Sequence, residues 1–359
     1  MLNFAVGPVQ SSEEVRKIGN ENVPYFRTAE FSEIMKENER IFLDLMDAPA
    51  NSRAIFLTGS GTASMEAAVM NTLDASDKAL VINGGSFGAR FAKICSVHDI
   101  AHDCIELEAG HTLCKEDLAP YENAGYTALL VNMGETSTGV LYDMNLIGDF
   151  CTRNNLFLIV DTVSTFLADQ FSMKNCGADI ALTGSQKALA CPPGVSVLAL
   201  SPRAQERVAR IDPKCIYFDF KDALSNGQRG QTPFTPAVQV LLQINVRLKD
   251  IEARGIDDEL GRVAARAKRF RKGIEDLPMT IFAQNPQTAV TSLKVKDGVD
   301  TKAIFDTCKD EFDMWLCPNG GELGKKIFRV GHIGELTLED VDEVIRVLHV
   351  LNDRGMLGA

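Results

Sequence analysis

Lys187 occupies a position in the sequence that suggests chemistry. It lies in ADIALTGSQKALACPPGVSV, residues 178–197, where it is the only charged residue after Asp179. An ammonium group among apolar neighbours must find a partner, remain in water or lose its proton. A lysine that loses its proton becomes a nucleophile. The alternative is a lysine on a surface loop, which the stretch by itself does not exclude.

Asp161 is a second candidate, because it is the first charged residue after the apolar run LFLIV, residues 156–160. Ligands of open α/β sheets bind beyond the carboxyl ends of the strands. A carboxylate at such a strand end can pair with a protonated ring nitrogen. The alternative is a structural role, in which Asp161 caps the loop that follows the strand.

The stretch LTGSGTASMEAA, residues 57–68, combines the end of a strand with the start of a helix. We call residues 59–62 the glycine turn. The free N–H groups of a helix N-terminus, with glycines that allow close approach, are suited to a phosphate. Ser60 and Thr62 add hydroxyl donors. The turn lacks the lysine of a P-loop and the GxGxxG spacing of a dinucleotide site, and a plain turn with Thr62 as helix cap is the alternative.

These three features predict one site if the strands run parallel, because the carboxyl ends of parallel strands open on the same sheet edge. A phosphate cradle, a carboxylate for a ring nitrogen and a lysine able to form a Schiff base together describe a site for pyridoxal 5'-phosphate (PLP). Desolvation and a nearby cation would both lower the pKa of Lys187 and so free its amine.

The elements around these residues predict an α/β fold. Continuous apolar strands, such as KALVIN, YTALLVNM, LFLIVD and ADIALTG, alternate with helical patterns up to about residue 250. Such strands are typical of a mostly parallel sheet that is covered on both faces. We expect an N-terminal arm over residues 1–20, a large cofactor-binding domain over 21–250, and a small C-terminal α+β domain over 251–359.

The composition excludes several classes of function. The net charge of −12 disfavours general nucleic-acid binding, and no apolar run approaches the roughly 18 residues of a membrane span. Nine scattered cysteines without a CxxC pair, in a chain whose start lacks the pattern of a secretory signal, indicate reduced thiols in the cytoplasm. No HExxH motif or His/Cys cluster predicts a metal site.

Five segments, in order along the chain, resemble one enzyme family. They are GSGTASMEA, NGGSFGAR, ETSTG, VDTVS and the pair GSQKAL and PPG. On these segments the chain resembles the class V (fold type I) PLP-dependent aminotransferases. It is similar to their alanine–glyoxylate/serine–pyruvate group and to the related 2-aminoethylphosphonate–pyruvate transaminases. The resemblance runs from GPVQ near the N-terminus to FRVGHIG near the C-terminus.

The resemblance implies a role for each matching residue. Lys187 would hold the cofactor and move the substrate proton, and Asp161 would pair with the ring nitrogen. Arg329 would fork onto the substrate carboxylate, Gly7 would line the entrance, and Glu135 would lie near the substrate. The remaining cofactor contacts would come from Ser60, Gly61, Thr62, Phe87, Ser137, Val163, Gln186 and, across a homodimer interface, Thr232.

The expected reaction is ping-pong transamination from a small amino acid, alanine or serine, to pyruvate or glyoxylate. One alternative is a 2-aminoethylphosphonate–pyruvate transaminase. Another is a class V lyase such as a cysteine desulfurase, for which Cys317 is the candidate nucleophile. An NAD-dependent oxidoreductase is disfavoured, because the sequence lacks the GxGxxG motif of such enzymes. Phe26, Arg27 and Thr28 depart from the family pattern, which usually has His before Arg-Ser, so the substrate is the least determined property.

Overall fold

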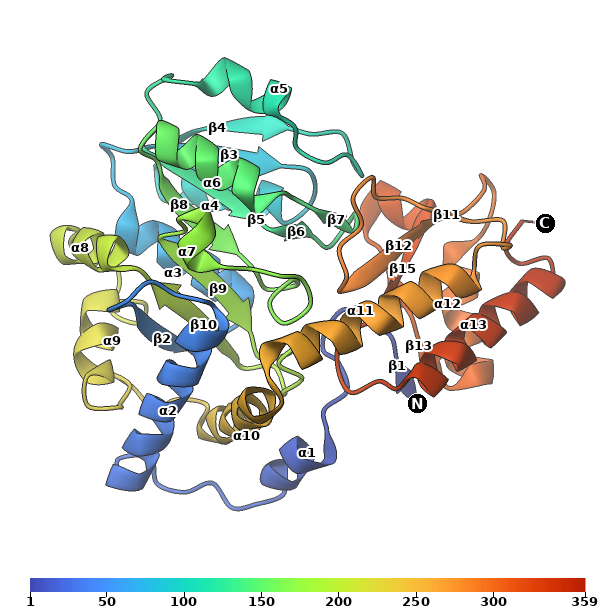
Figure 1. The fold of residues 1–359 in the computed structure, drawn as a ribbon, viewed down its shortest axis with the longest axis horizontal. Helices are drawn as coiled ribbons and strands as arrows, with labels where there is room; N and C mark the ends of the chain where they lie inside the picture. The colour runs from blue at the N-terminus through green and yellow to red at the C-terminus, as the bar shows by residue number, and fades with distance from the viewer. Residues whose placement is uncertain (359) are drawn as a thin grey trace.

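The computed structural model describes residues 1–358, and its centre is a large sheet (Figure 1). Within these residues seven strands form this sheet in the order β2-β10-β9-β8-β5-β3-β4. β9, β8, β5, β3 and β4 are mutually parallel, and β10 runs antiparallel to both β2 and β9. The prediction of a mostly parallel sheet is therefore confirmed. In sheet order the strands are β2 (Arg53–Thr58), β10 (Val195–Leu200), β9 (Ile180–Gly184), β8 (Phe157–Asp161), β5 (Ala128–Asn132), β3 (Lys78–Asn83) and β4 (Ala101–Glu106).

Both faces of the sheet are buried, as continuous apolar strands require. Along β3, Leu80 and Ile82 join one hydrophobic cluster, whereas Ala79 and Val81 join the other. The first face is covered mainly by α2 (Ala29–Leu45), α6 (Met144–Arg153), α7 (Met173–Cys176) and α10 (Val238–Arg254). The second face is covered by α3 (Gly61–Thr72), α4 (Gly88–Val97), α8 (Pro202–Arg210) and α9 (Phe220–Gly227).

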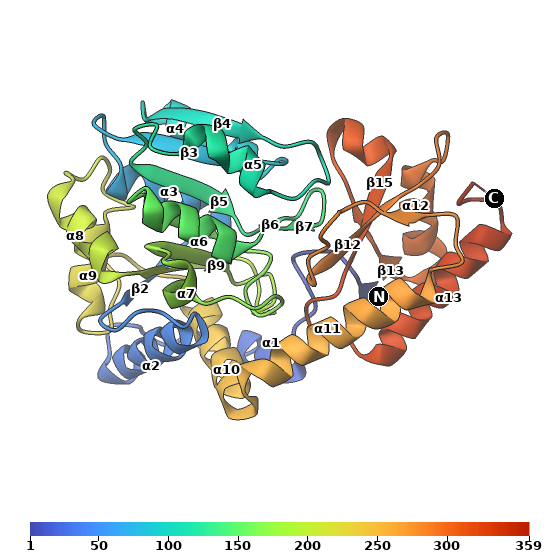
Figure 2. The ribbon, with the colours of Figure 1, turned by 45° about the horizontal axis from the view of Figure 1, so that its top comes forward.

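A second, smaller body lies beside the large sheet and contains both the first strand and the last helix (Figure 2). Its antiparallel sheet has the order β11-β12-β15-β14, formed by β11 (Thr280–Ile281), β12 (Val290–Lys294), β15 (Ile327–Gly331) and β14 (Cys317–Pro318). α12 (Thr301–Phe312) and α13 (Leu338–Asp353) pack on it through a third hydrophobic cluster. α11 (Ile256–Gly273) links the two bodies, because Val263 belongs to the first cluster and Phe270 to the third.

The N-terminal arm begins on the small body and leads towards the large one. β1 (Leu2–Asn3) pairs in parallel with β13 (Met314–Trp315), and Phe4 is buried in the third cluster. Val6 and Val9 already belong to the first cluster. α1 (Glu13–Gly19) then packs against α10. The arm is therefore held at both ends, and the residues between them pass from one body to the other.

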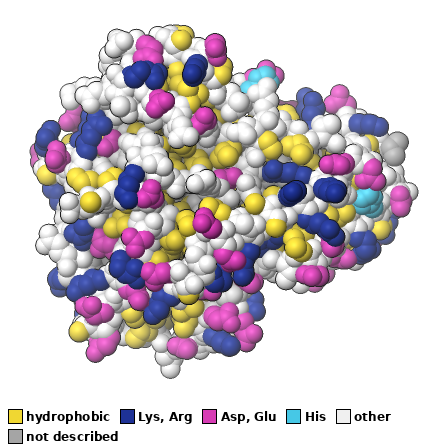
Figure 3. Space-filling model, in the orientation of Figure 1, with side chains coloured by type: hydrophobic (Ala, Val, Ile, Leu, Met, Phe, Trp, Pro, Cys, Tyr) yellow, Lys and Arg dark blue, Asp and Glu magenta, His cyan; other side chains and the backbone are white. Residues whose placement is uncertain are grey.

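The remaining short elements complete the connections. α5 (Lys115–Leu118) and the 3₁₀ helix at Ala119–Tyr121 follow β4, and a second 3₁₀ turn spans Gly321–Lys325. β6 (Gly134–Glu135) and β7 (Val140–Leu141) form a two-stranded hairpin around the ETSTG segment. Acidic and basic side chains are interspersed on the face that Figure 3 shows.

Candidate active site

The register of the strands places Asp161, Lys187 and the glycine turn at one edge of the sheet, where the sequence predicted them. β10 passes between β2 and β9, with Val195 opposite Thr58 and Ser196 opposite Gly184. Since β2, β9 and β8 run in the same direction, their carboxyl ends lie together. The approach is close: a Cβ on Gly61 would lie 2.8 Å from Cγ2 of Val163, so the turn admits only glycine there without rearrangement.

Lys187 lies in the loop after β9, and the N-terminal arm covers it. Its half-buried side chain donates a hydrogen bond from Nζ to the carbonyl oxygen of Val6. Gly7 has φ of +120°, and a Cβ there would lie 2.7 Å from Cδ of the lysine. Burial, opposed in part by Cys317 and Asp161, lowers the pKa of Lys187 to about 8. A lysine with this pKa is partly neutral near pH 7.5, which is the state that a nucleophile or base requires.

Asp161 ends β8 and is 5% exposed. Its Oδ1 accepts a hydrogen bond of 2.7 Å from the N–H of Val163. Burial raises the pKa of Asp161 to about 6, although the Val163 bond and the charge of Lys187 oppose the rise. Within residues 1–358 its Oδ2 receives no hydrogen bond, so one carboxylate oxygen remains for a ligand N–H.

The glycine turn leads into α3 with unused donors. Ser60 is the N-cap residue, and its exposed side chain makes no capping hydrogen bond. Thr62 is therefore not the helix cap that the plain-turn alternative requires. The hydroxyl groups and first-turn N–H groups of a 12-residue helix are together suited to an anion. Gln186 lies at the end of β9, where a Cβ on Gly184 would be 2.6 Å from its Oε1, and its contact with the phosphate stays a prediction.

Glu135 has a structural role that the sequence did not reveal. Its carboxylate is fully buried and accepts hydrogen bonds from the N–H groups of Phe87 and Gly88, each at 3.2 Å, and from Asn132 at 3.1 Å. Ser137 donates its hydroxyl to the same carboxylate and accepts from the N–H of Ser86. Glu135 therefore fixes the turn that presents Phe87 at the N-terminus of α4, and its expected place near the substrate stays a prediction.

Arg329 lies on β15 and reaches from the small body to the large one. Nη1 donates to the carbonyl oxygen of Thr136 at 2.9 Å, and Nη2 donates to that of Pro318 at 2.7 Å. Its Nε is buried and, among the residues that the structure describes, has no partner. Its positive charge lowers the pKa of the Lys187 amine, although burial of the amine has the larger effect. The guanidinium is thus oriented near the lysine with donors left for a carboxylate.

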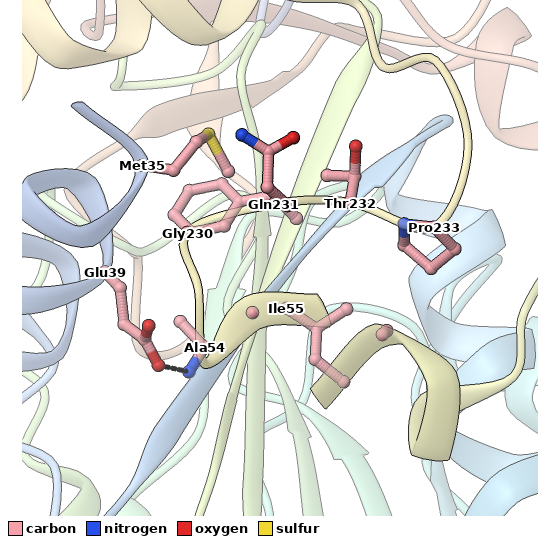
Figure 4. A pocket seen from close by; sticks show the side chains of 11 residues that line it. Met35, Glu39, Ala54, Ile55, Gly230, Gln231, Thr232 and Pro233 are labelled. Atoms are coloured by element: carbon pink, nitrogen blue, oxygen red, sulfur yellow. Dashed lines mark hydrogen bonds between the residues drawn. The ribbon is translucent and has the colours of Figure 1, made fainter. Parts of the chain in front are cut away.

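Thr232 lies on the loop that crosses β2 (Figure 4). Its hydroxyl donates to the carbonyl oxygen of Phe234 at 2.7 Å. Arg27 holds the loop by donating to the carbonyl oxygens of Thr232 and Pro233 at 2.7 and 3.0 Å. In the described part of one chain, no hydrogen bond connects Thr232 with the glycine turn. Its assignment to a neighbouring subunit's site stays a prediction.

The other sequence-based expectations concern metals, disulfides and membranes. The nine cysteines are free, and no cluster of residues in the described chain could hold a metal ion. A search of the helices in residues 1–358 found none long and apolar enough to cross a membrane.

Cys317 is part of β14, paired with Arg329, rather than in the flexible loop that a desulfurase nucleophile requires.

The site fits the cofactor that the sequence predicts. A buried carboxylate with a free oxygen matches a ring N–H, the unused donors of the glycine turn match a phosphate, and the amine of Lys187 matches an aldehyde. These three groups lie at one edge of the sheet, where a single molecule can reach them all. The individual residue assignments stay predictions.

Comparison with known proteins agrees with this reading of the site. The family model described as "Aminotransferase class-V" matches residues 18–312. An uncharacterized aminotransferase of Methanocaldococcus jannaschii is 30% identical over 342 residues, which cover 91% of this chain and 86% of the relative. L-aspartate–glyoxylate aminotransferase of Paracoccus denitrificans is 28% identical, with 93% of this chain and 86% of that protein covered. Serine–glyoxylate aminotransferase of Hyphomicrobium methylovorum is also 28% identical, with coverages of 93% and 85%.

A solved structure supports the same conclusion. Aspartate aminotransferase from Thermus thermophilus superposes with a TM-score of 0.91 at 26% identity, over 98% of this chain and 99% of that one. The family match spans most of the chain, and several relatives are serine–glyoxylate or alanine–glyoxylate aminotransferases. This chain therefore belongs to the class V aminotransferase family and is a PLP-dependent transaminase with the type I fold.

Proposed function

We propose that this enzyme transfers the amino group of alanine or serine to glyoxylate or pyruvate. The observation that carries the proposal is the position of Arg329. Its guanidinium is held by two backbone carbonyls, and its positive charge lowers the pKa of Lys187. Such a fork binds the carboxylate that all these substrates share. Two of the relatives named above support glyoxylate as the acceptor, because their own names specify it.

Each residue of the site has a task in this reaction. Bound PLP supplies an aldehyde that takes up the amino group and a protonated ring that withdraws electrons from the substrate. Lys187, as the neutral amine, would remove the proton from Cα and deliver it to the former aldehyde carbon, which lies on the other side of the amino nitrogen. Asp161 holds the ring proton through Oδ2, and Arg329 orients the carboxylate. The arm at Val6 and Gly7 covers the lysine and limits the access of water.

A half-reaction screen tests the substrate. Enzyme loaded with PLP is mixed with alanine, serine, aspartate or 2-aminoethylphosphonate, and the change in cofactor absorbance gives a rate for each donor. The aminated enzyme is then mixed with glyoxylate or pyruvate. We expect alanine or serine with glyoxylate to give the highest kcat/KM. A response to 2-aminoethylphosphonate alone would establish the alternative transaminase, and preference for aspartate would contradict the proposed donor.

Arg329→Ala is expected to raise KM for amino acid and oxo acid substrates by roughly 10–100-fold, since a charged hydrogen bond contributes about 1.5–3 kcal/mol. Steady-state kinetics with alanine and glyoxylate measure the change. Lys294→Ala, an exposed position on the neighbouring strand β12, is the matched control and is expected to leave KM unchanged. An unchanged KM in Arg329→Ala would refute the carboxylate role.

The pKa of Lys187 gives a pH prediction for the apoenzyme. Only the neutral amine attacks the aldehyde, and the pKa of about 8 lies below the ordinary 10.5. The rate of covalent PLP capture is therefore expected to rise with pH from 7 to about 8 and to be level above pH 9. Stopped-flow absorbance measures this rate. A rate that continues to rise towards pH 10.5 would show that the amine has the pKa of an exposed lysine.

We also propose that the protein forms a homodimer and that it is located in the cytoplasm. The loop at Thr232 borders exposed apolar side chains, with Ile216 79%, Tyr217 46% and Phe234 38% exposed. Tyr217 and Phe234 stack with ring centroids 5.6 Å apart, which makes a flat apolar surface suited to a second copy. Sedimentation over a range of concentrations tests the dimer, and a monomer at micromolar concentration would contradict it.

A further inference from the structure

We propose that Arg90 is a positioning residue for the cofactor, which it serves by holding the hydroxyl of Thr62 and the ring of Phe87 in one arrangement. The proposal rests on the proposed function, because it takes Thr62 as a phosphate ligand and Phe87 as the ring that stacks on PLP.

Arg90 connects two helices at their N-terminal ends. It is the third residue of α4, and its Nη1 donates to Oγ1 of Thr62, in the first turn of α3, at 3.0 Å. The same guanidinium lies over the ring of Phe87, with its central carbon 4.6 Å from the ring centroid. One half-buried side chain therefore contacts both the glycine turn and the aromatic residue.

The contact with Thr62 determines what its hydroxyl can do. A hydroxyl group has one proton to donate, and here its oxygen already accepts from a cation. The proton is therefore free to be donated elsewhere, and accepting from a charged donor strengthens that second bond. Near the N-terminus of α3, the strongest hydrogen bond that this proton can form is one to an anion.

The contact with Phe87 determines which face of its ring is available. The guanidinium covers one face through a cation–π interaction. The backbone N–H of Phe87 is bound by the buried carboxylate of Glu135. The ring is thus fixed from its backbone and from one face, which leaves the opposite face for a planar ligand.

The charge of Arg90 has a compatible effect on the two central groups. Burial has the largest effect on the pKa of both Asp161 and Lys187, and the positive charge of Arg90 then lowers both. A lower pKa favours the carboxylate form of Asp161 and the neutral amine of Lys187. Both are the forms that a PLP site uses.

The experiment compares Arg90→Met with Lys93→Met, an exposed lysine on the same helix. Apoenzyme is titrated with PLP and with pyridoxal, which lacks the phosphate, and bound cofactor is measured by absorbance and visible circular dichroism. We expect Arg90→Met to weaken PLP binding about tenfold or more, to weaken pyridoxal binding less, and to change the dichroism of the bound cofactor. Lys93→Met is expected to match the wild type. Equal weakening of both ligands, or none, would overturn the proposal.

A double-mutant cycle with Thr62→Val tests the coupling. If Arg90 acts through the hydroxyl, Thr62→Val with Arg90→Met weakens PLP no more than the stronger single change. Multiplied effects of the two changes would overturn this. Far-ultraviolet dichroism checks folding, and Arg90→Lys provides the test if Arg90→Met does not fold: retention of wild-type affinity by lysine would show a point charge rather than an orienting fork. Failure of the wild-type apoenzyme to bind PLP would instead refute the assigned site.

Discussion

Lys187→Ala is expected to reduce the transamination rate by about 10⁴-fold, the upper end of what a general acid–base residue contributes, because the same side chain is also the nucleophile. The variant is still expected to bind PLP, since Asp161, Arg90 and the glycine turn are intact. Single-turnover kinetics with alanine measure the rate. Borohydride treatment followed by peptide mapping is expected to fix the cofactor on residue 187 of the wild type and on no residue of the variant.

Rescue by an added amine and retention of the cofactor in Lys187→Ala distinguish the roles of the lysine. A small primary amine such as ethylamine is expected to restore part of the rate, because the alanine leaves the space of the lysine side chain beneath the arm at Gly7. Wild-type activity in Lys187→Ala would move the base to another residue. A variant that binds no PLP would show that the lysine contributes chiefly to retention of the cofactor.

Asp161→Asn is expected to lower kcat/KM by about 10³-fold, comparable to the loss of a group that stabilises charge in a transition state. The amide keeps the acceptor for the N–H of Val163 but no longer holds a proton on the ring nitrogen. Steady-state kinetics and the absorbance maximum of bound cofactor measure the effect. A variant with wild-type kcat/KM would exclude Asp161 as the partner of the ring nitrogen.

The same substitution is expected to stabilise the apoenzyme. The pKa of Asp161 is raised by burial from 3.8 to about 6, so at pH 7.5 the buried carboxylate is charged and destabilises the folded state by up to about 3 kcal/mol. This cost is relieved as the pH falls from about 6 towards 4. Thermal unfolding at pH 7.5 is expected to give a higher Tm for Asp161→Asn without cofactor. A lower Tm would contradict the assigned cost of burial.

Much of the fold was determined by local sequence patterns. The apolar runs KALVIN, YTALLVNM, LFLIVD and ADIALTG predicted β3, β5, β8 and β9. β4 was not predicted, because it is an edge strand whose first four residues alternate between exposed and half-buried rather than forming an apolar run. The reversed direction of β10 was also not predicted, because a buried strand has the same composition in either direction.

The sequence by itself determined which residues carry chemistry at the sheet edge. Asp161, Lys187 and the glycine turn each follow an apolar strand, and residue type and position after a strand are properties of short stretches. Parallel pairing then places such ends together. The family resemblance added Arg329 and Phe87, which no short stretch would identify.

Only the tertiary structure decided how those residues are held. Val6 reaches Lys187 because β1 pairs with β13 of the small body, and Glu135 binds the N–H groups that precede α4. Arg90 contacts Thr62 across two helices. Each of these contacts joins segments that are far apart in sequence, and the packing of whole elements decides whether they meet. For this reason the sequence identified the reactive groups, whereas the folded chain determined their orientation, their protonation and their supporting residues.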